Sequence, residues 1–377
     1  MECVNEALIP GLPDDVALIC LAKISHGFLG VLECVCKRWR DVIHSEDYAS
    51  YKLAKGWCGD WLFVLTEGSE NYWSAYDPNA DRWHTLPRMP TCYQGPHFGF
   101  SCVSVCNRFL VIGGTYVGPC DSRLSIVTNQ VFSFDPFKQQ WNQIASMSTP
   151  RRDFACSVIC GKVYVGGGCN SLFTGGLSSA EVYDPIKDRW EDLPTMLNPR
   201  ADCYGVSYNN KFCVLSNKLD LSDQKTVEVY NPCDRCWCTV HDEWKLPTKL
   251  QSGIIVINDR LYIVIDWGDN SVQTRNTENG YWYHVGSVPA VTIPDHPRLL
   301  ESFGYSVCCL RKKLYIIGGK AIKLEERGGR RFDIVKLRTM RVCDPSTTPL
   351  KWRETRSFFG SAGGSIIGCG SLEECLH

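Results

Sequence analysis

Long hydrophobic runs are missing from this chain of 377 residues. No apolar segment approaches the ~20 residues that a membrane-spanning helix needs. Residues 1–6 are acidic and lack the basic start and apolar core of a secretory signal peptide. Charge of one sign is missing too, because 40 Lys and Arg residues stand against 41 Asp and Glu residues. These absences exclude a global attraction to nucleic acid or to anionic membranes and favour a cytoplasmic or nuclear protein.

Paired metal ligands and catalytic constellations are also missing. The eight histidines show no paired spacing and no Ser, His and Asp order that indicates a hydrolase. Cys233 and Cys236 form a Cys-x-x-Cys pair, but no second pair follows at zinc-finger spacing. The 22 cysteines occur without a secretion signal, which favours reduced thiols over a disulfide framework. We therefore expect no catalytic residue, no metal and no cofactor.

The chain does contain an internal repeat. Six tryptophans recur at intervals of 58, 49, 47, 45 and 70 residues: Trp83, Trp141, Trp190, Trp237, Trp282 and Trp352. The first four follow, by seven positions, the aromatic residue of a Tyr-Asp-Pro-like triplet: Tyr76, Phe134, Tyr183 and Tyr230. A period of about 50 residues predicts a propeller or a solenoid, because one unit alone cannot bury its apolar face. We expect the tryptophans to pack between units and the Asp-Pro steps to form Asx turns.

Each repeat contains short β-rich runs. An apolar run opens each unit, at residues 61–65, 109–112, 163–165, 212–215, 261–265 and 314–317. Three of these runs end in a glycine pair, which lets the backbone turn with no Cβ in the way. Four strands per unit make a propeller blade. Because the first unit has room for only three strands and residues 363–369 resemble an unpaired opening strand, we expect the C-terminal strand to complete the first blade and close the ring.

Residues 12–48 follow a helical period instead. Pro13 suits a first helical turn, and the two acidic residues after it suit the positive end of a helix. A second helical stretch, residues 29–43, places Val35 and Trp39 on one apolar stripe. The pattern predicts a small all-α domain ahead of the β repeat.

The Leu-Pro start at Leu12 and the Val-Cys-Lys-Arg-Trp pattern of residues 35–39 resemble an F-box, and the glycine pairs, Tyr-Asp-Pro triplets and spaced tryptophans resemble kelch repeats. This order is similar to that of the plant F-box/kelch-repeat proteins. The resemblance implies a mainly β fold: a six-bladed kelch β-propeller closed by a C-terminal strand and preceded by a small all-α F-box. It divides the chain into an F-box domain (1–50), a linker (51–60) and a propeller (61–377).

The resemblance also implies that the F-box docks on the Skp adaptor of a cullin-RING ubiquitin ligase while the propeller binds the protein to be ubiquitylated, so that no chemistry occurs on this chain. The N-terminal helices carry more apolar groups than they can bury alone, which predicts contact with the adaptor. The predicted adaptor-binding residues are Leu12, Pro13, Val16, Leu18, Ile19, Leu21, Val35 and Trp39. The alternative is that this stripe packs against the propeller.

A basic arc is the candidate target site. His97, Arg151, Arg200 and Lys249 fall at one register, just before the opening strands of units two to five, and Arg298 could join them. A propeller places equivalent loops on one face, so these five residues are predicted to bind an acidic or phosphorylated protein surface. The alternative is that each cation pairs with a neighbouring acid, such as Asp153 or Asp202, and only solvates a loop.

Two other functions compete with the ligase receptor. A kelch-propeller enzyme or metal-dependent specifier would need clustered ligands in the central mouth. A non-ligase scaffold would bind the adaptor through the same helices without supporting ubiquitylation, and the sequence does not separate it from a receptor. In each case we expect no nucleic-acid and no membrane partner.

Overall fold

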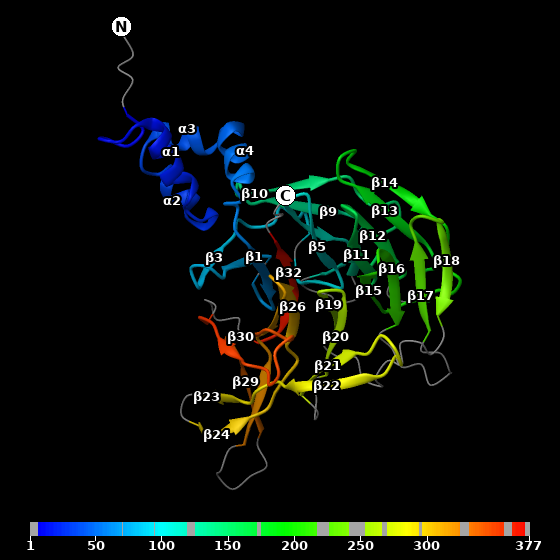
Figure 1. Cartoon of the computed structure of the whole chain (residues 1–377). Helices are drawn as coiled ribbons and strands as arrows, with labels where there is room; N and C mark the ends of the chain where they lie inside the picture. The colour runs from blue at the N-terminus through cyan, green and yellow to red at the C-terminus, as the bar shows by residue number, and fades with distance from the viewer. Residues whose placement is uncertain are drawn as a thin grey trace.

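The computed structural model describes residues 7–69, 71–93, 95–118, 125–171, 175–216, 226–240, 253–265, 270–293, 296–324, 332–357 and 364–373. Helices come first and strands follow (Figure 1). The helical domain consists of α1 (Asp14–Ala22), the 3-10 turn η1 (His26–Phe28), α2 (Leu29–Glu33), α3 (Lys37–Ile43) and α4 (Glu46–Ala54). Because α4 continues to Ala54, the first residues of the predicted linker are helical.

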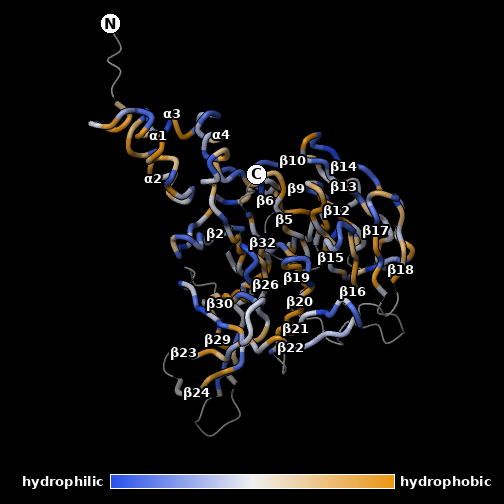
Figure 2. Tube along the Cα trace, in the orientation of Figure 1, coloured by the Kyte–Doolittle hydropathy of each residue, from blue (hydrophilic) through white to orange (hydrophobic). Residues whose placement is uncertain are grey.

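Local chemistry fixes the ends of these helices. Pro13 stands at the N-cap of α1, where its missing N–H costs nothing, and Asp14 and Asp15 lie in the first turn. Ser45 caps α4 by accepting a hydrogen bond from the Tyr48 backbone N–H at 3.2 Å. The Tyr48 hydroxyl in turn donates to the Leu21 carbonyl at 3.0 Å and so ties α4 to the end of α1. Figure 2 shows hydrophobic colouring along parts of α1 and along strands at the centre of the propeller.

Six four-stranded antiparallel sheets form the propeller among the described residues. Blade 1 holds β32 (Ile366–Leu372), β1 (Trp61–Thr66), β2 (Ser74–Asp77) and β3 (Arg82–Thr85); blade 2 holds β5 (Ser101–Val105), β6 (Arg108–Ile112), β9 (Val131–Asp135) and β10 (Gln140–Ile144); blade 3 holds β11 (Ala155–Ile159), β12 (Lys162–Gly166), β13 (Ala180–Asp184) and β14 (Arg189–Leu193). Blade 4 holds β15 (Cys203–Tyr208), β16 (Lys211–Ser216), β17 (Val227–Asn231) and β18 (Cys236–Val240); blade 5 holds β19 (Ile254–Ile257), β20 (Arg260–Ile265), β21 (Ser271–Arg275) and β22 (Trp282–Ser287); blade 6 holds β26 (Ser306–Leu310), β27 (Lys313–Ile317), β30 (Met340–Cys343) and β31 (Arg353–Glu354).

The ring closes through the C-terminal strand, as the sequence predicts. β32 pairs with β1 as the innermost strand of blade 1, with Trp61 opposite Leu372. The six innermost strands contact one another in the cyclic order β5, β11, β15, β19, β26, β32 and back to β5. Across the closing seam, the Ser104 hydroxyl of β5 donates to the Ser371 carbonyl of β32 at 2.5 Å. Closure leaves no open edge at this seam.

The repeated tryptophans link each blade to the blade before it. In five units the indole N–H donates to a carbonyl near the end of the preceding blade: Trp83 to Arg356 at 2.8 Å, Trp141 to Pro87 at 2.9 Å, Trp190 to Ala145 at 2.8 Å, Trp237 to Pro194 at 2.7 Å and Trp352 to Ser287 at 3.0 Å. The prediction that these rings pack between blades is therefore confirmed. A ring at this position buries apolar area and also satisfies its polar N–H.

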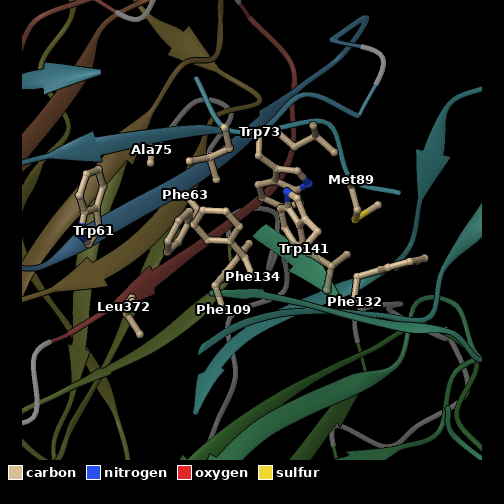
Figure 3. Close-up of a cluster of buried hydrophobic side chains, with 13 residues drawn as sticks. Trp61, Phe63, Trp73, Ala75, Met89, Phe109, Phe132, Phe134, Trp141 and Leu372 are labelled. Carbon is tan, nitrogen blue, oxygen red and sulfur yellow. The ribbon is translucent and has the colours of Figure 1, made fainter. Parts of the chain in front are cut away.

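The aromatic residues of blades 1 and 2 form a shared core. The rings of Phe63 and Phe109 stack with centroids 4.2 Å apart, and Trp73 meets Phe109 edge-on at 5.1 Å. Figure 3 shows these rings converging with Trp141 from strands of both blades. The predicted turns are also confirmed, since the Asp135 carboxylate accepts from the Phe137 backbone N–H at 2.9 Å and Asp184 accepts from Ile186 at 3.1 Å.

Two blades carry additional strands. In blade 2 a hairpin of β7 (Thr115–Val117) and β8 (Ser125–Val127) pairs with β4 (His97–Phe98), and in blade 6 a hairpin of β28 (Lys320–Leu324) and β29 (Phe332–Lys336) pairs with β25 (Ser302–Phe303). A further pair, β23 (Val291–Ile293) and β24 (His296–Leu300), precedes β25. Both hairpins leave their blade between its second and third strands, so both project from one face of the ring, which we call the hairpin face.

No single described helix is both long and apolar enough to cross a membrane. α1 and the segment His26–Glu33 reach that length and composition only together, and the chain bends by 104° between them.

Candidate functional site

The helical domain leaves several aliphatic side chains exposed. The exposed fractions are 36% for Leu12, 38% for Val16, 66% for Val31 and 58% for Val35, and Pro13 is exposed as well. An ion pair of 2.6 Å between Arg38 and Asp14 brings the start of α3 against the start of α1. Leu12, Pro13, Val16 and Val35 therefore lie at the same end of the domain, and with Val31 they form what we call the helical apolar face. Val31 was not predicted, although its position in the second helical stretch was a usable signal.

The other predicted adaptor residues are partly or fully buried. Leu21 is 1% exposed and packs with Ala17, Leu29 and Ile43, so its assignment to the adaptor surface is corrected to the core of the helical domain. Leu18, Ile19 and Trp39 are half-buried. The Trp39 indole N–H donates to the Leu8 carbonyl at 2.7 Å, which fixes the chain that precedes α1. Leu18, Ile19 and Trp39 therefore expose only part of their side chains to a partner.

An ionised carboxylate, that of Asp14, lies at the same end of the domain. The Leu8 backbone N–H donates to the Asp14 carboxylate at 2.7 Å and, with the Arg38 guanidinium, holds the pKa of Asp14 below its ordinary value. Asp14 therefore stays ionised beside the helical apolar face. The ion pair of Asp14 with Arg38 thus joins the start of α1 to the start of α3 beside this face.

The predicted basic arc is mostly buried. Arg151 is 0% exposed, and its guanidinium donates to Glu181 at 2.9 Å, to the Gly167 carbonyl at 3.0 Å and to the Ser179 carbonyl at 2.9 Å. Glu181 also accepts from the backbone N–H of Ser148 at 2.7 Å. Its charge is paired and its donors are satisfied, so Arg151 is not a free cation. It links the loop before β11 to β13, the third strand of blade 3, and we call this buried Arg151–Glu181 pair a pin.

Blade 4 repeats this pin one unit later. Arg200 is 5% exposed and donates to Glu228 at 3.3 Å, to the Ser216 hydroxyl at 2.8 Å and to the Thr226 hydroxyl at 3.0 Å. Glu228 accepts from the backbone N–H of Leu197 at 2.8 Å. The sequence-based alternative, pairing with an acid, is correct in kind, but the partners come from β13 and β17 and not from Asp153 or Asp202. The expectation that Arg151 and Arg200 form an exposed arc is wrong, because burial removes their charge from the surface.

His97 occupies the same register in blade 2 and is not a cation either. It is 1% exposed, its Nε2 lies 2.8 Å from the Gly113 carbonyl, and its ring stacks on Tyr116 with centroids 4.0 Å apart. Burial lowers the pKa of His97 to about 4, so the ring is neutral near pH 7. Lys249 and the side chain of Arg298 lie outside the part of the chain that the structure describes, and their predicted role stays a prediction.

Blade 6 builds the pin in the reverse sense, which the sequence reasoning missed. Arg341 on β30 is 1% exposed and donates to the Ser302 hydroxyl at 3.0 Å and to the Pro289 carbonyl at 2.7 Å. Ser302 stands at the register that Arg151 and Arg200 hold in their blades. The signal was present in the sequence, since Glu181, Glu228 and Arg341 all stand three residues before the Asp or Asn of the turn triplet.

Four exposed apolar side chains lie on the hairpins and on β4, while Tyr72, Ile186, Leu197, Tyr281, Tyr283 and Leu299 are exposed on other elements of the propeller. The exposed fractions are 38% for Phe98, 48% for Ile126, 37% for Ile322 and 56% for Ile334. Exposed Lys336 follows on β29 and exposed Arg338 lies just beyond it. The long intervals of 58 and 70 residues between tryptophans mark the blades that carry these insertions, because the other intervals are 45 to 49. Exposed apolar surface rimmed by charge is typical of protein-binding sites, which makes the hairpin face the candidate target surface.

The two candidate surfaces lie on opposite faces of the ring. The helical domain joins blade 1 beside the turns that connect third and fourth strands, whereas the hairpins leave between second and third strands, and in an antiparallel blade these connections are at opposite ends. Figure 1 shows the helices at one end of the molecule and β23, β24 and β29 at the other. Among the described residues, no group of three or more His, Cys, Asp and Glu side chains is arranged to hold a metal ion.

Comparison with known proteins agrees with this architecture. A family model described as F-box domain matches residues 9–49, and one described as Kelch motif matches residues 96–148 and 150–197. An F-box/kelch-repeat protein of Arabidopsis thaliana is 54% identical over 99% of both chains, and the Arabidopsis F-box/kelch-repeat protein SKIP30 is 34% identical over 68% of this chain and 71% of its own length.

A solved structure shows the likeness at the level of the fold alone. The structure of YjhT superposes with a TM-score of 0.57 at 14% sequence identity, covering 78% of this chain and 95% of YjhT. The N-terminal helices, the closed ring of six blades and the full-length match to a relative with the same two parts all point the same way. The chain belongs to the F-box/kelch-repeat family.

Proposed function

We propose that this chain is the substrate receptor of a Skp-cullin-F-box ubiquitin ligase, in which the helical apolar face docks the Skp adaptor and the hairpin face binds the protein to be ubiquitylated. The observation that carries the proposal is the position of exposed aliphatic groups at the end of a helical domain that matches the F-box model. A chain of this family has a substrate-receptor role in general; the ligase, the adaptor contact and the target surface are the finer proposals.

The mechanism is positioning. Binding holds a lysine of the target near the ubiquitin-loaded enzyme and so raises its effective concentration without any bond being made or broken on this chain. Each surface supplies part of the required affinity. Aliphatic residues supply apolar area at about 25 cal/mol per Å² buried, and the Asp14–Arg38 clamp keeps α1 and α3 in register. We also propose that the protein acts in the cytoplasm, the nucleus or both, where such a ligase would meet its targets.

The proposed target has an apolar and acidic surface. Phe98, Ile126, Ile322 and Ile334 would contact aliphatic or aromatic groups of the target, and Lys336 would meet an acidic or phosphorylated group. Lys249 and Arg298 remain proposed contributors of positive charge. The buried pins of Arg151 and Arg200 would support the loops beneath this surface and would not touch the target.

Adaptor capture tests the first half of the proposal. Purified wild type and the double variants Leu12→Ala with Pro13→Ala and Val16→Asp with Val35→Asp are compared for binding to the Skp adaptor. Both variants are expected to lose binding, the aspartates more completely, because they place charge in a desolvated contact. The matched control is Leu53→Asp, on the exposed side of α4. Unchanged adaptor binding by both double variants would overturn the proposal.

A further inference from the structure

The helical domain touches the propeller through a second contact besides the chain itself. Residues of η1 lie against the outer strand of blade 1 and against a turn of blade 2. Figure 1 shows the helices standing at the edge of the ring near β3 and β10. We call this contact the joint, and it comprises His26, Gly27 and Phe28 on the helical side and Arg82, His84 and Phe137 on the propeller side.

His26 is the buried centre of one half of the joint. It is 1% exposed, its Nδ1 lies 2.6 Å from the Cys58 carbonyl, and its ring meets Phe137 edge-on with centroids 4.6 Å apart. Burial, with the nearby Lys52 ammonium, lowers the pKa of His26 to about 3, so the ring is neutral and its Nδ1–H can donate to the carbonyl. The neutral imidazole packs against Phe137 through this edge-to-face contact.

His84 is the centre of the other half. Its ring meets Phe28 at 5.4 Å and Trp61 at 5.5 Å between centroids, and the Arg82 guanidinium lies 5.6 Å from the centre of the Phe28 ring. The backbone of Gly27 approaches the same imidazole so closely that an added Cβ would overlap it. Gly27 is thus required by close approach and not by backbone conformation.

The covalent connection is short and fixed as well. Only residues 55–60 separate α4 from β1. Within them Cys58 is 7% exposed and Asp60 is 2% exposed, and Asp60 forms an ion pair with Arg311 of blade 6. The helical domain is therefore attached to the propeller at two separate places, the connection and the aromatic contact.

We propose that the joint holds the helical domain at one fixed angle to the propeller, with His84 as the positioning residue, so that the vector from the adaptor surface to the bound target is set by this chain. The inference rests on the proposed function for its consequence, since a rigid span gives a high effective concentration only at lysines within reach. The attachment of the helical domain to the propeller is inferred from the contacts alone and does not depend on the proposed function.

The test compares full-length wild type, Gly27→Ala, His84→Ala and the double variant, with His44→Ala, at the exposed C-cap of α3, as the control. Trypsin cleavage after exposed Lys55, at the start of the connection, reports opening. Each single variant is expected to be cleaved about three- to tenfold faster, the change that follows from losing one buried aromatic contact. The double variant should be cleaved more slowly than Gly27→Ala, because removing the imidazole makes room for the Cβ. Small-angle scattering should show a broader distance distribution in the single variants.

The positioning role has its own readout. In a ligase reconstituted from the Skp adaptor, a cullin, a RING subunit and ubiquitin, lysines of this chain can serve as acceptors, and mass spectrometry maps them. Wild type is expected to be modified at a narrow set of propeller lysines, and the single variants at a wider set with unchanged adaptor affinity. An unchanged map in variants that are opened would overturn the positioning role.

The other outcomes of these experiments distinguish the rigid attachment, the positioning role and the proposed function. Cleavage and scattering equal to wild type in both single variants would overturn the joint as a rigid attachment. If wild type itself fails to bind the adaptor, the proposed function and the positioning role both fall, whereas the rigid attachment still stands or falls on cleavage and scattering. Thermal unfolding of each variant separates local opening from loss of the fold, since an opened joint leaves the propeller transition unchanged.

Discussion

Blades 3 and 4 and blades 2 and 6 share one repeat but use the hairpin face differently. In blades 3 and 4 an arginine at the loop is buried against a glutamate of the third strand. In blades 2 and 6 the connection between the second and third strands carries a hairpin with exposed aliphatic residues. The comparison shows that a cation recurring at one register can be structural, and that the units departing from the common length are the ones that carry exposed hairpins.

The largest expected effect comes from breaking a pin. Glu181→Ala leaves the Arg151 guanidinium buried without its counter-charge, which should cost ~3–5 kcal/mol of unfolding free energy. Thermal or urea unfolding measures this loss, and Glu228→Ala should behave alike in blade 4. Glu191→Ala, on an exposed position of the same blade, is the control and should leave the midpoint unchanged.

A matched double variant sharpens that result. Replacing both partners, Arg151→Met with Glu181→Leu, should recover most of the stability lost in Glu181→Ala, because no buried charge is left unpaired. A double variant as unstable as the single one would show that the hydrogen bonds of Arg151 and Glu181 to the loops, and not the pairing of their charges, stabilise this blade.

The buried histidine of blade 2 makes the stability of this blade sensitive to acid. The pKa of His97 is about 4 in the folded chain and 6.5 is its ordinary value. Between pH ~6.5 and pH 4 the unfolded chain is therefore protonated at His97, whereas the folded chain is not. The contribution of His97 to the free energy of unfolding is complete above pH ~6.5 and decreases as the pH falls towards 4. The loss attributable to His97 is roughly 3 kcal/mol. His97→Phe should flatten the curve of unfolding free energy between pH 7 and pH 4.5.

A smaller stability effect is expected for the reversed pin of blade 6. Ser302→Ala removes one hydrogen bond to Arg341 while the Pro289 carbonyl remains as its partner, and should cost ~1–3 kcal/mol. Urea unfolding checks this value. A loss as large as that of Glu181→Ala would mean that blade 6 depends on its pin as much as blade 3 does.

The smallest stability effect and the clearest functional one belong to the hairpins. Ile126→Asp with Ile334→Asp should change unfolding free energy by less than ~0.5 kcal/mol per site, because both side chains are exposed, yet should abolish target recovery in trapped-substrate proteomics. Ile186→Asp is the control, since Ile186 is 91% exposed on the opposite face. Equal target recovery by the double variant and the control would remove the hairpin face from the proposal.

Most of the fold could be predicted from the repeat pattern in the sequence. Trp141 and Trp190 bond the preceding blade, as their spacing predicts, and β32 completes blade 1, as the short first unit predicts. The site was predicted less well. Leu12, Val16 and Val35 are exposed as expected, but Leu21 is core, and Arg151 and Arg200 are buried. Periodicity reports which residues share a register, not which of them keep contact with water.

The sequence by itself determined the family, the number of repeats, the closing strand and the helical start, because these follow from local spacing and from chain length. Only the tertiary structure decided which charges are paired, since Arg151 and Glu181 are 30 residues apart and meet across a loop and a strand. It also decided that η1 lies on His84, which sets where the helical domain stands. Such contacts depend on how neighbouring blades and domains pack, and no local period encodes them.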